Sequence, residues 1–263
     1  MDSSDTFDVV QTVVRSGGEY LLAKRSEDNF WEFMGGKVKE EEDLKQAAIR
    51  ELNEETDLEL SQEELHDFRK GDSYRSEDDD RFRLNPVFFE VSEKKKREMS
   101  PEGLSEEHTD FEWIELTEFD RYDTLGQYPA LEHLDVVNGR VALALVEKDG
   151  EFLVVKRSEE NSTPGKWSTV SGGIEPGETP EDAAKRELRE ETGMEAEVVE
   201  KGGYYIGEGE QGTWRLEPVL MEYKSGEIDL NWELSRYRWV EPGEVENLDT
   251  LGKLKGFDKL GLR

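Results

Sequence analysis

Three glutamates in the second half of the chain have the type and spacing of a metal site. Glu187, Glu190 and Glu191 stand at positions i, i+3 and i+4, so a helix over this segment places all three on one face. Carboxylates gathered in this way repel one another unless a cation lies between them. Oxygen ligands on one side, with space for water and phosphate oxygens, suit Mg²⁺ or Mn²⁺. The adjacent Arg186 is placed to orient one carboxylate.

The flanking residues predict this helix and a loop before it. Thr179 suits the N-cap, Pro180 the first helical position, and Gly193 a left-handed residue that ends the helix. The Gly/Pro-rich segment 172–178 favours a tight turn. A solvated acidic helix face is the simpler alternative, because the chain is acidic throughout.

The same pattern occurs upstream, where the equivalent residues are Arg50, Glu51, Glu54 and Glu55. Other segments repeat as well: 24–26 with 156–158, 83–87 with 215–219, and 123–126 with 249–252. The chain therefore consists of two copies of one unit. We expect domains over residues 1–130 and 136–263, without a flexible linker between them.

Together these residues resemble the Nudix box. The pattern Gly-x5-Glu-x7-Arg-Glu-Leu-x-Glu-Glu-x-Gly is complete from Gly172 and recurs from Gly36, with Asp57 at the place of the last glycine. The resemblance implies two tandem α/β/α sandwiches, each a mixed sheet flanked by helices. It also implies hydrolysis of a nucleoside diphosphate linked to another moiety, with Mg²⁺ or Mn²⁺ as cofactor.

Carried onto this chain, the resemblance implies metal ligands at Glu187, Glu190 and Glu191 and at Glu51, Glu54 and Glu55, with Arg186 and Arg50 as their orienting partners. The substrate-binding loops would contain Gly172, Gly173 and Glu178 in one copy and Gly36, Lys37 and Glu42 in the other. Glu107 and Glu233 precede the repeated tryptophans 113 and 239, and each is either an additional catalytic carboxylate or a surface acid.

Two other residue types near the boxes have alternative interpretations. His108 has no counterpart in the second copy, where Leu234 stands, so we expect a surface histidine. Trp31 and Trp167 precede the boxes and either stack on a base or fill the core, which is the more usual use of tryptophan.

The substrate class is less sharply indicated. The segment 31–38 is similar to the MutT-like branch, which implies a nucleoside triphosphate or a related nucleotide. ADP-ribose and dinucleoside polyphosphates are alternatives; Tyr74 fits the latter in the first copy, but segment 210–212 of the second does not. A tandem module that binds nucleotides without turnover is a further alternative, which the intact glutamates of both copies disfavour.

The two copies are expected to differ. Asp57 would be strained in the left-handed conformation of Gly193, by about 1 kcal/mol. Lys37, Glu40 and Glu41 replace Gly173, Pro176 and Gly177. We therefore expect the second copy to carry most of the turnover; the alternative is that Lys37 compensates and the first copy is tuned to another substrate.

The amino-acid composition limits the classes of partner that the chain can bind. The 263 residues carry a net charge of −31 and no cysteine, which excludes disulfides and disfavours nucleic acid and anionic membranes as partners. We expect a cytoplasmic enzyme with a halophilic surface, a small-molecule nucleotide as substrate, and a pseudo-dimer of the two copies within the chain.

Several elements follow from local patterns. Segment 81–91 is expected as a strand in which Pro86 marks an edge or a bulge. A helix is expected over 118–134, broken near Pro129 and with Leu125, Leu131 and Leu134 on one face, and a final helix with Leu251, Leu254, Phe257 and Leu260 on one side. The basic run 94–97 is expected as a solvated turn.

Overall fold

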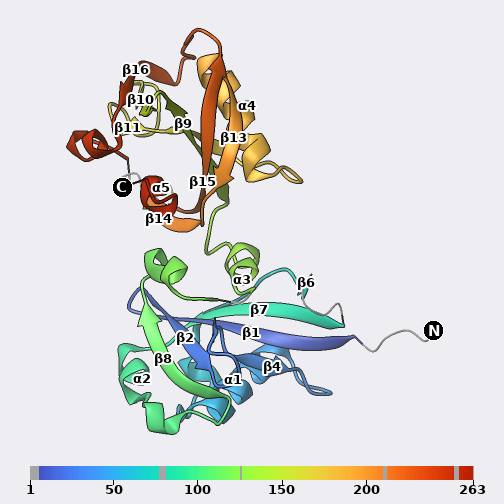
Figure 1. Ribbon diagram of the computed structural model, residues 1–263. Coiled ribbons are helices and arrows are strands. Elements are labelled where there is room, and N and C mark those ends of the chain that lie inside the picture. Colours follow the sequence, from blue (N-terminus) through green and yellow to red (C-terminus); the bar gives the residue numbers. More distant parts are fainter. Residues whose placement is uncertain (1–5, 77–80, 125, 210–211, 252–254, 263) are drawn as a thin grey trace. The chain divides into compact units, whose positions relative to one another are not determined.

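Contacts divide the chain into a first unit, Met1–Asn138, and a second, Gly139–Arg263. β-branched residues dominate the first strand of the first unit, whereas alanine and leucine dominate that of the second. The computed structural model describes residues 6–76, 81–124, 126–209, 212–251 and 255–262. The positions Leu125, Leu254 and 210–211, which entered the expectations above, lie outside the described residues. Figure 1 shows that each unit contains a mixed sheet with helices packed against it.

The first unit has eight strands: β1 (Phe7–Ser16), β2 (Glu19–Arg25), β3 (Trp31–Glu32), β4 (Gly35–Lys37), β5 (His66–Lys70), β6 (Tyr74–Arg75), β7 (Phe82–Glu90) and β8 (His108–Ile114). Its helices are α1 (Leu44–Glu55), α2 (Glu93–Glu98) and α3 (Tyr128–His133), with 3-10 turns η1 (Gln62–Glu64), η2 (Pro101–Gly103) and η3 (Leu116–Arg121). The sheet order is β3-β2-β1-β7-β5, with β8 beside β2, β4 beside β1 and β6 beside β7.

The second unit repeats this plan with β9 (Arg140–Lys148), β10 (Glu151–Arg157), β11 (Trp167–Ser168), β12 (Val170–Gly173), β13 (Glu195–Lys201), β14 (Tyr205–Gly209), β15 (Gly212–Ser225) and β16 (Leu234–Val240). Its helices are α4 (Pro180–Thr192) and α5 (Gly256–Lys259), with the 3-10 turn η4 (Pro242–Asn247). The order β11-β10-β9-β15-β13 matches the first unit strand for strand. In each sheet one pair is parallel, β1 with β7 and β9 with β15.

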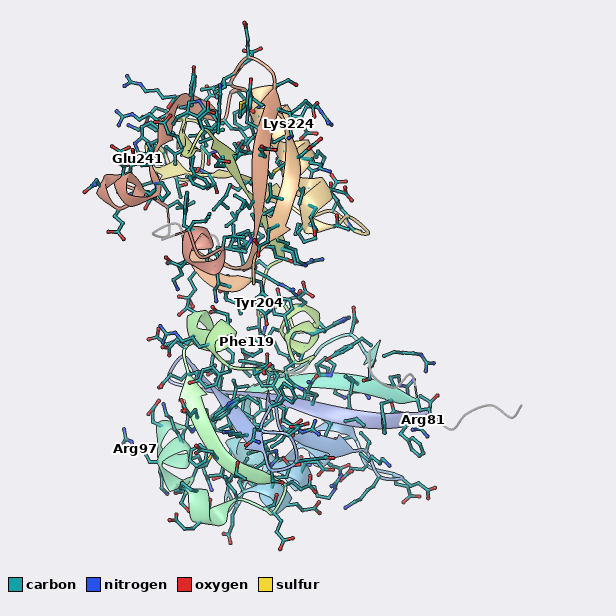
Figure 2. All side chains as sticks on the ribbon, in the orientation of Figure 1. Arg81, Arg97, Phe119, Tyr204, Lys224 and Glu241 are labelled. Carbon is teal, nitrogen blue, oxygen red and sulfur yellow. The ribbon has the colours of Figure 1, made fainter. Side chains whose placement is uncertain are left out.

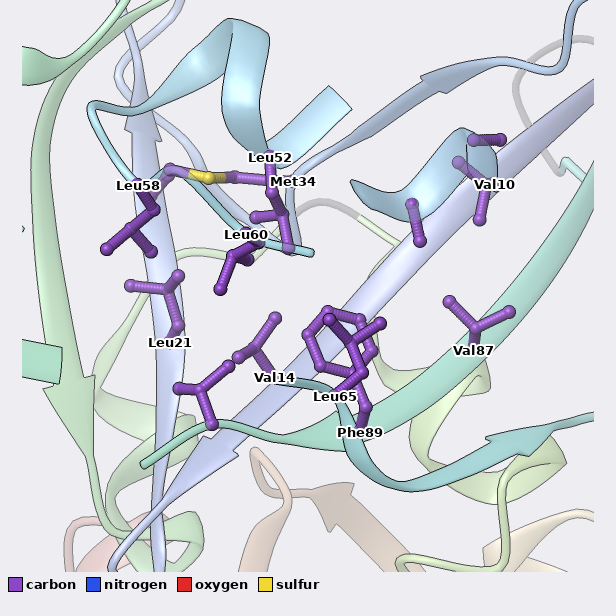
Figure 3. Packing of buried hydrophobic residues seen from close by; sticks show 14 of the residues in the cluster. Val10, Val14, Leu21, Met34, Leu52, Leu58, Leu60, Leu65, Val87 and Phe89 are labelled. Carbon is purple, nitrogen blue, oxygen red and sulfur yellow. The ribbon is translucent and has the colours of Figure 1, made fainter. Parts of the chain in front are cut away.

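A hydrophobic core between α1 and the sheet fixes the helix of the first box. Val10, Val14 and Phe89 from the strands pack against Leu52 of α1 and against Met34 (Figure 3). Val13, Leu22 and Phe88 have the opposite strand parity and are also fully buried, so the second face of the sheet is covered as well. The same two-faced packing recurs in the second unit, with α4 on one face and α5 on the other.

Pro86 lies within an internal strand, so the expected edge position was wrong. β7 has β1 on one side and β5 and β6 on the other. The neighbouring strand is interrupted opposite the proline, because Lys70 pairs with Val87 and Tyr74 pairs with Leu84. Proline lacks the N–H that a continuous ladder would need, and the interruption removes that need.

Two expected helices and the expected turn at 94–97 were also wrong. Segment 118–134 forms η3 and α3 rather than one helix, and Pro129 stands in the first turn of α3, where a proline has no N–H to lose. The final helix is only α5, and Leu251 is exposed. The basic run is the helix α2, whose lysines pair with acidic residues and whose Arg97 extends into solvent (Figure 2).

No helix among the residues that the structure describes is long and apolar enough to cross a membrane.

Candidate active site

Both box helices begin and end with strong local signals. Thr179 caps α4 by accepting a hydrogen bond from Asp182 N at 3.1 Å, and Gly193 ends the helix with φ of 70°. Asp43 caps α1 in a reciprocal pair with Gln46, over 2.8 and 2.9 Å. The Thr179 cap confirms the predicted start of α4, and both caps fix the position of the glutamates relative to the loops that precede them.

An arginine joins the loop and the helix in the second unit. Arg186 donates from Nε and Nη2 to both oxygens of Glu178, each at 3.0 Å. Its Nη1 donates to Glu187 Oε1 at 2.6 Å and lies 3.6 Å from Glu190 Oε2. Its Nη2 also donates to the Gly173 carbonyl at 2.8 Å. One guanidinium therefore fixes the loop and orients two of the three predicted metal ligands.

The first unit contains the same arrangement. Arg50 donates to both oxygens of Glu42 at 2.8 Å, to Glu51 Oε1 at 2.7 Å and to Glu54 Oε2 at 3.0 Å. It also donates to the Lys37 carbonyl at 2.9 Å. The hydrogen bonds from Arg50 lower the pKa of Glu42 to about 2, and those from Arg186 lower the pKa of Glu178. Glu42 and Glu178 are thus ionised partners of the arginines.

One glycine in each loop is required by the carboxylate behind it. A Cβ on Gly172 would lie 1.9 Å from the Glu187 carboxyl carbon, and a Cβ on Gly36 would lie 2.3 Å from Glu51 Oε1. A side chain in either place would displace the glutamate carboxylate from the arginine that holds it. The backbone of the loop therefore lies directly against the first glutamate of the box.

The next loop position carries no such requirement. A Cβ on Gly173 would meet nothing within 4 Å, and the first unit has Lys37 there, whose Nζ lies 4.4 Å from the ring centroid of Phe7. The lysine that replaces Gly173 in the first unit therefore causes no steric clash.

The third glutamate of each box is buried. Burial, followed by the nearby charges of Glu51 and Glu107, raises the pKa of Glu55 to about 9. Burial, followed by Glu187 and Glu233, raises the pKa of Glu191 to about 8. The structure thus brings Glu107 and Glu233, each immediately before a strand, close to the buried glutamate of its own unit.

The donor set fits a divalent cation. Oε2 of Glu55 is buried and has no hydrogen-bond partner among the described residues, which leaves a carboxylate oxygen available as a ligand. Among the described residues, no three histidine or acidic side chains form a group that could hold a metal ion as they stand. The arginines engage Glu51 and Glu187. Glu51, Glu54 and Glu55, and Glu187, Glu190 and Glu191, would hold the metal, together with water and phosphate oxygens.

The expectation that His108 is a surface residue was wrong. His108 is buried, 6% exposed, at the start of β8, and its Nε2 lies 3.2 Å from Glu32 Oε1. Its Nδ1 lies 3.9 Å from Glu55 Oε2. The strand register causes this burial, because His108 pairs with Arg25 in β2 beside the box helix. One sequence signal could have indicated this contact. Glu32 and His108 of the first copy are both replaced in the second copy, by Ser168 and Leu234.

The expected strain at Asp57 was also wrong. The chain leaves α1 at Thr56 with φ of −135°, and Asp57 accepts a hydrogen bond from Ser100 Oγ at 3.0 Å instead of taking a left-handed conformation. Left-handed geometry occurs in the loop, where Glu41 has φ of 63° and the equivalent Gly177 has 83°.

Two further residues of the site carried no assigned role at the level of sequence. Arg157, the arginine of the repeated Lys-Arg-Ser segment, donates from Nε to Asn161 Oδ1 at 2.8 Å, and its charge opposes the rise in the pKa of Glu191. The equivalent Arg25 lies 3.3 Å from Asp28 and 3.7 Å from Glu32.

The two tryptophans that precede the boxes also differ between the units. Trp167 is buried in the core, whereas Trp31 is half-buried and packs edge-on against Tyr122, with the ring centroids 5.1 Å apart.

Comparison with known proteins finds similar domains. The NUDIX domain profile matches residues 5–134 and again 137–258. The chain is 29% identical over 121 residues to the nucleoside triphosphatase NudI of Escherichia coli O1:K1, a match that covers 41% of this chain and 86% of that protein. The MutT protein of Methanosarcina mazei Go1 is 26% identical, with a TM-score of 0.40 over 47% of this chain and 94% of that one. The E. coli ORF135 protein is 27% identical, with a TM-score of 0.40 over 47% and 86%.

The chain belongs to the Nudix family, and it contains two domains of that family in tandem. It is a hydrolase. Hydrolases of this family use a divalent metal ion, in agreement with the carboxylate donors of both units.

Proposed function

We propose that the protein hydrolyses the pyrophosphate bond of a nucleoside triphosphate or a closely related nucleotide, with Mg²⁺ as the metal ion at the all-carboxylate site. The observation that carries the proposal is the arginine-oriented glutamate pair behind a glycine loop, present in both units with the same contacts. The name of the relative NudI, a nucleoside triphosphatase, supports the substrate class.

The residues of each unit have separable tasks in this reaction. Arg186 keeps Glu187 and Glu190 turned toward one side of α4, and Gly172 lets the loop backbone approach that side. A bound divalent ion would neutralise phosphate charge and activate water for attack at phosphorus. Glu233, whose charge acts on Glu191, is then placed to accept the proton that the attacking water gives up.

The test is hydrolysis of a panel of nucleoside triphosphates, ADP-ribose and dinucleoside polyphosphates with Mg²⁺. The products are separated by anion-exchange chromatography, because ADP-ribose and dinucleoside polyphosphates yield nucleotides or sugar phosphates rather than free phosphate. Substituting Glu54→Gln and Glu55→Gln in one unit, and Glu190→Gln and Glu191→Gln in the other, keeps side-chain size and removes ligand charge. We expect the four substitutions together to abolish hydrolysis while circular dichroism stays unchanged. Full activity in this variant would refute the site, and turnover of ADP-ribose alone would refute the substrate class.

Each pair of substitutions made alone measures the share of each unit. The second unit is expected to carry more of the turnover, because four consecutive acids, residues 40–43, stand in the loop of the first unit and oppose an anionic substrate. An equal loss from each pair would show that both units work at similar rates.

A further inference from the structure

The buried histidine of the first unit has a carboxylate on one side of its ring and an unpaired glutamate oxygen on the other. The His108 side chain is 2% exposed. Its Nε2 is 3.2 Å from Glu32 Oε1, which makes Nε2–H the donor to that carboxylate when the ring is neutral. Nδ1 then carries the lone pair on the side of Glu55.

The two facing atoms lack any other partner. His108 Nδ1 and Glu55 Oε2 are both buried, and neither has a hydrogen-bond partner among the described residues. They lie 3.9 Å apart, too far for a hydrogen bond. Bonds of about 2.0–2.2 Å to one metal ion span two ligand atoms up to about 4.2 Å apart. Two unsatisfied buried acceptors at this separation are the arrangement that a shared cation would satisfy.

The second unit shows what the site is like without this pair. Leu234 occupies the place of His108, and Ser168 occupies that of Glu32. There Glu191 accepts a backbone hydrogen bond from Ser171 and faces the charge of Arg157. Both members of the histidine–carboxylate pair are therefore present in one unit and absent from the other.

We propose that His108 is a nitrogen ligand of the divalent ion in the first unit, oriented by Glu32, so that this unit selects Mn²⁺ over Mg²⁺ while the all-oxygen second unit does not. The proposal rests on the proposed function only in taking Glu51, Glu54 and Glu55 as a metal site. A metal-bound histidine usually donates its other N–H to a carboxylate, which is the role of Glu32. Imidazole nitrogen favours transition metals, whereas Mg²⁺ favours oxygen ligands.

The test uses the untagged full-length chain with Glu187→Gln, Glu190→Gln and Glu191→Gln, so that the first unit holds the remaining box. Mn²⁺ is added, and pulsed electron paramagnetic resonance records coupling of the ion to ¹⁴N. The chain has three histidines, His66, His108 and His133, and no cysteine, so a nitrogen ligand is assigned directly. We expect histidine-type ¹⁴N modulation that persists in His66→Gln and His133→Gln and disappears in His108→Leu.

Affinity gives a second readout. His108→Leu is expected to weaken Mn²⁺ binding by about 10–100-fold and to leave Mg²⁺ binding nearly unchanged. The converse change, Leu234→His with Ser168→Glu in a chain whose first box carries Glu51→Gln, Glu54→Gln and Glu55→Gln, is expected to introduce ¹⁴N modulation in the second unit.

The outcomes separate this inference from the proposed function. Bound Mn²⁺ without ¹⁴N modulation in the parent chain overturns the role of His108 and leaves the glutamate site standing. Failure of the parent chain to bind Mn²⁺ or Mg²⁺ overturns both. The parent spectrum needs no substitution at His108, so it decides the question even if His108→Leu does not fold.

Discussion

Arg186 donates a hydrogen bond of 2.6 Å from Nη1 to Oε1 of Glu187, its neighbour in sequence. Replacement by lysine keeps the charge but loses the planar fork that also engages Glu178. In a chain whose first box is inactivated by Glu54→Gln and Glu55→Gln, Arg186→Lys should lower turnover by about 10–100-fold.

Arg189→Lys is the matched control, because Arg189 pairs with Glu195 on the exposed side of α4. It should leave turnover within about twofold, since exposed ion pairs contribute little. Equal losses from Arg186→Lys and Arg189→Lys would show that the contacts of Arg186 have no special role.

The two glycines of the second loop should respond differently to alanine. Gly172→Ala places a methyl group against the Glu187 carboxylate and should destabilise the unit by about 1–3 kcal/mol, with loss of activity. Gly173→Ala meets open space and should be nearly silent. Urea unfolding followed by tryptophan fluorescence measures both, and a silent Gly172→Ala would contradict the close approach.

Gly177 and Glu41 both have left-handed backbone conformations, so substitutions at these two positions should change stability in opposite directions. Gly177→Ala adds a Cβ in open space at φ of 83°, so only backbone strain changes, and stability should fall by about 1 kcal/mol. Glu41→Gly relieves the strain at φ of 63° in the first unit and should raise stability by about 0.5 kcal/mol after the entropy cost of glycine. Gly203→Ala, at an open position without positive φ, serves as the control.

The buried glutamates predict how metal-free protein responds to pH. The folded pKa of Glu55 is about 9 and that of Glu191 about 8, both above the ordinary value of 4.5. The unfolded chain therefore releases these protons first, and stability present at pH 4 should decline steadily between about pH 5 and pH 9.

Melting temperatures in EDTA across this range provide the measurement. Glu55→Gln with Glu191→Gln should flatten the profile and raise the melting temperature at pH 8. A profile that rises with pH would contradict the burial of these carboxylates in the absence of metal.

The net charge of −31 predicts a requirement for salt. At low ionic strength the mutual repulsion is unscreened, because the Debye length grows from about 3 Å at 1 M to about 30 Å at 0.01 M. Melting temperature should therefore be higher in molar KCl than in dilute buffer. Equal values would remove the halophilic interpretation and leave solubility as the role of the acids.

The parts of the site that the sequence predicted are those encoded within one segment. The cap Thr179 and the contact of Arg186 with Glu187 both depend on residues a few positions apart. The position of His108 depends on Glu32, 76 residues away, and on the register between β2 and β8. Local patterns carry no information about that pairing, so the sequence alone predicted a surface histidine.

The end of α1 shows a different limit. Asp57 occupies the place of Gly193, and aligned positions suggested the same backbone conformation. Asp57 instead accepts a hydrogen bond from Ser100, a residue outside the box, and its backbone does not take the left-handed conformation. A single replaced glycine can therefore be accommodated by a new contact rather than by strain.

The parallel pairing of β1 with β7 has a consequence for biosynthesis. Arg15 and Glu90, which are joined across this pair, are 75 residues apart, so β1 emerges from the ribosome long before its partner exists. β9 and β15 pair in the same register as β1 and β7. During folding, β1 and β9 could therefore each pair with either β7 or β15. Exchange between copies would place Gln11 where Leu143 belongs, and burying an amide among apolar side chains opposes such misassembly. We expect this divergence to disfavour pairing of a strand with the wrong half of the duplicated chain.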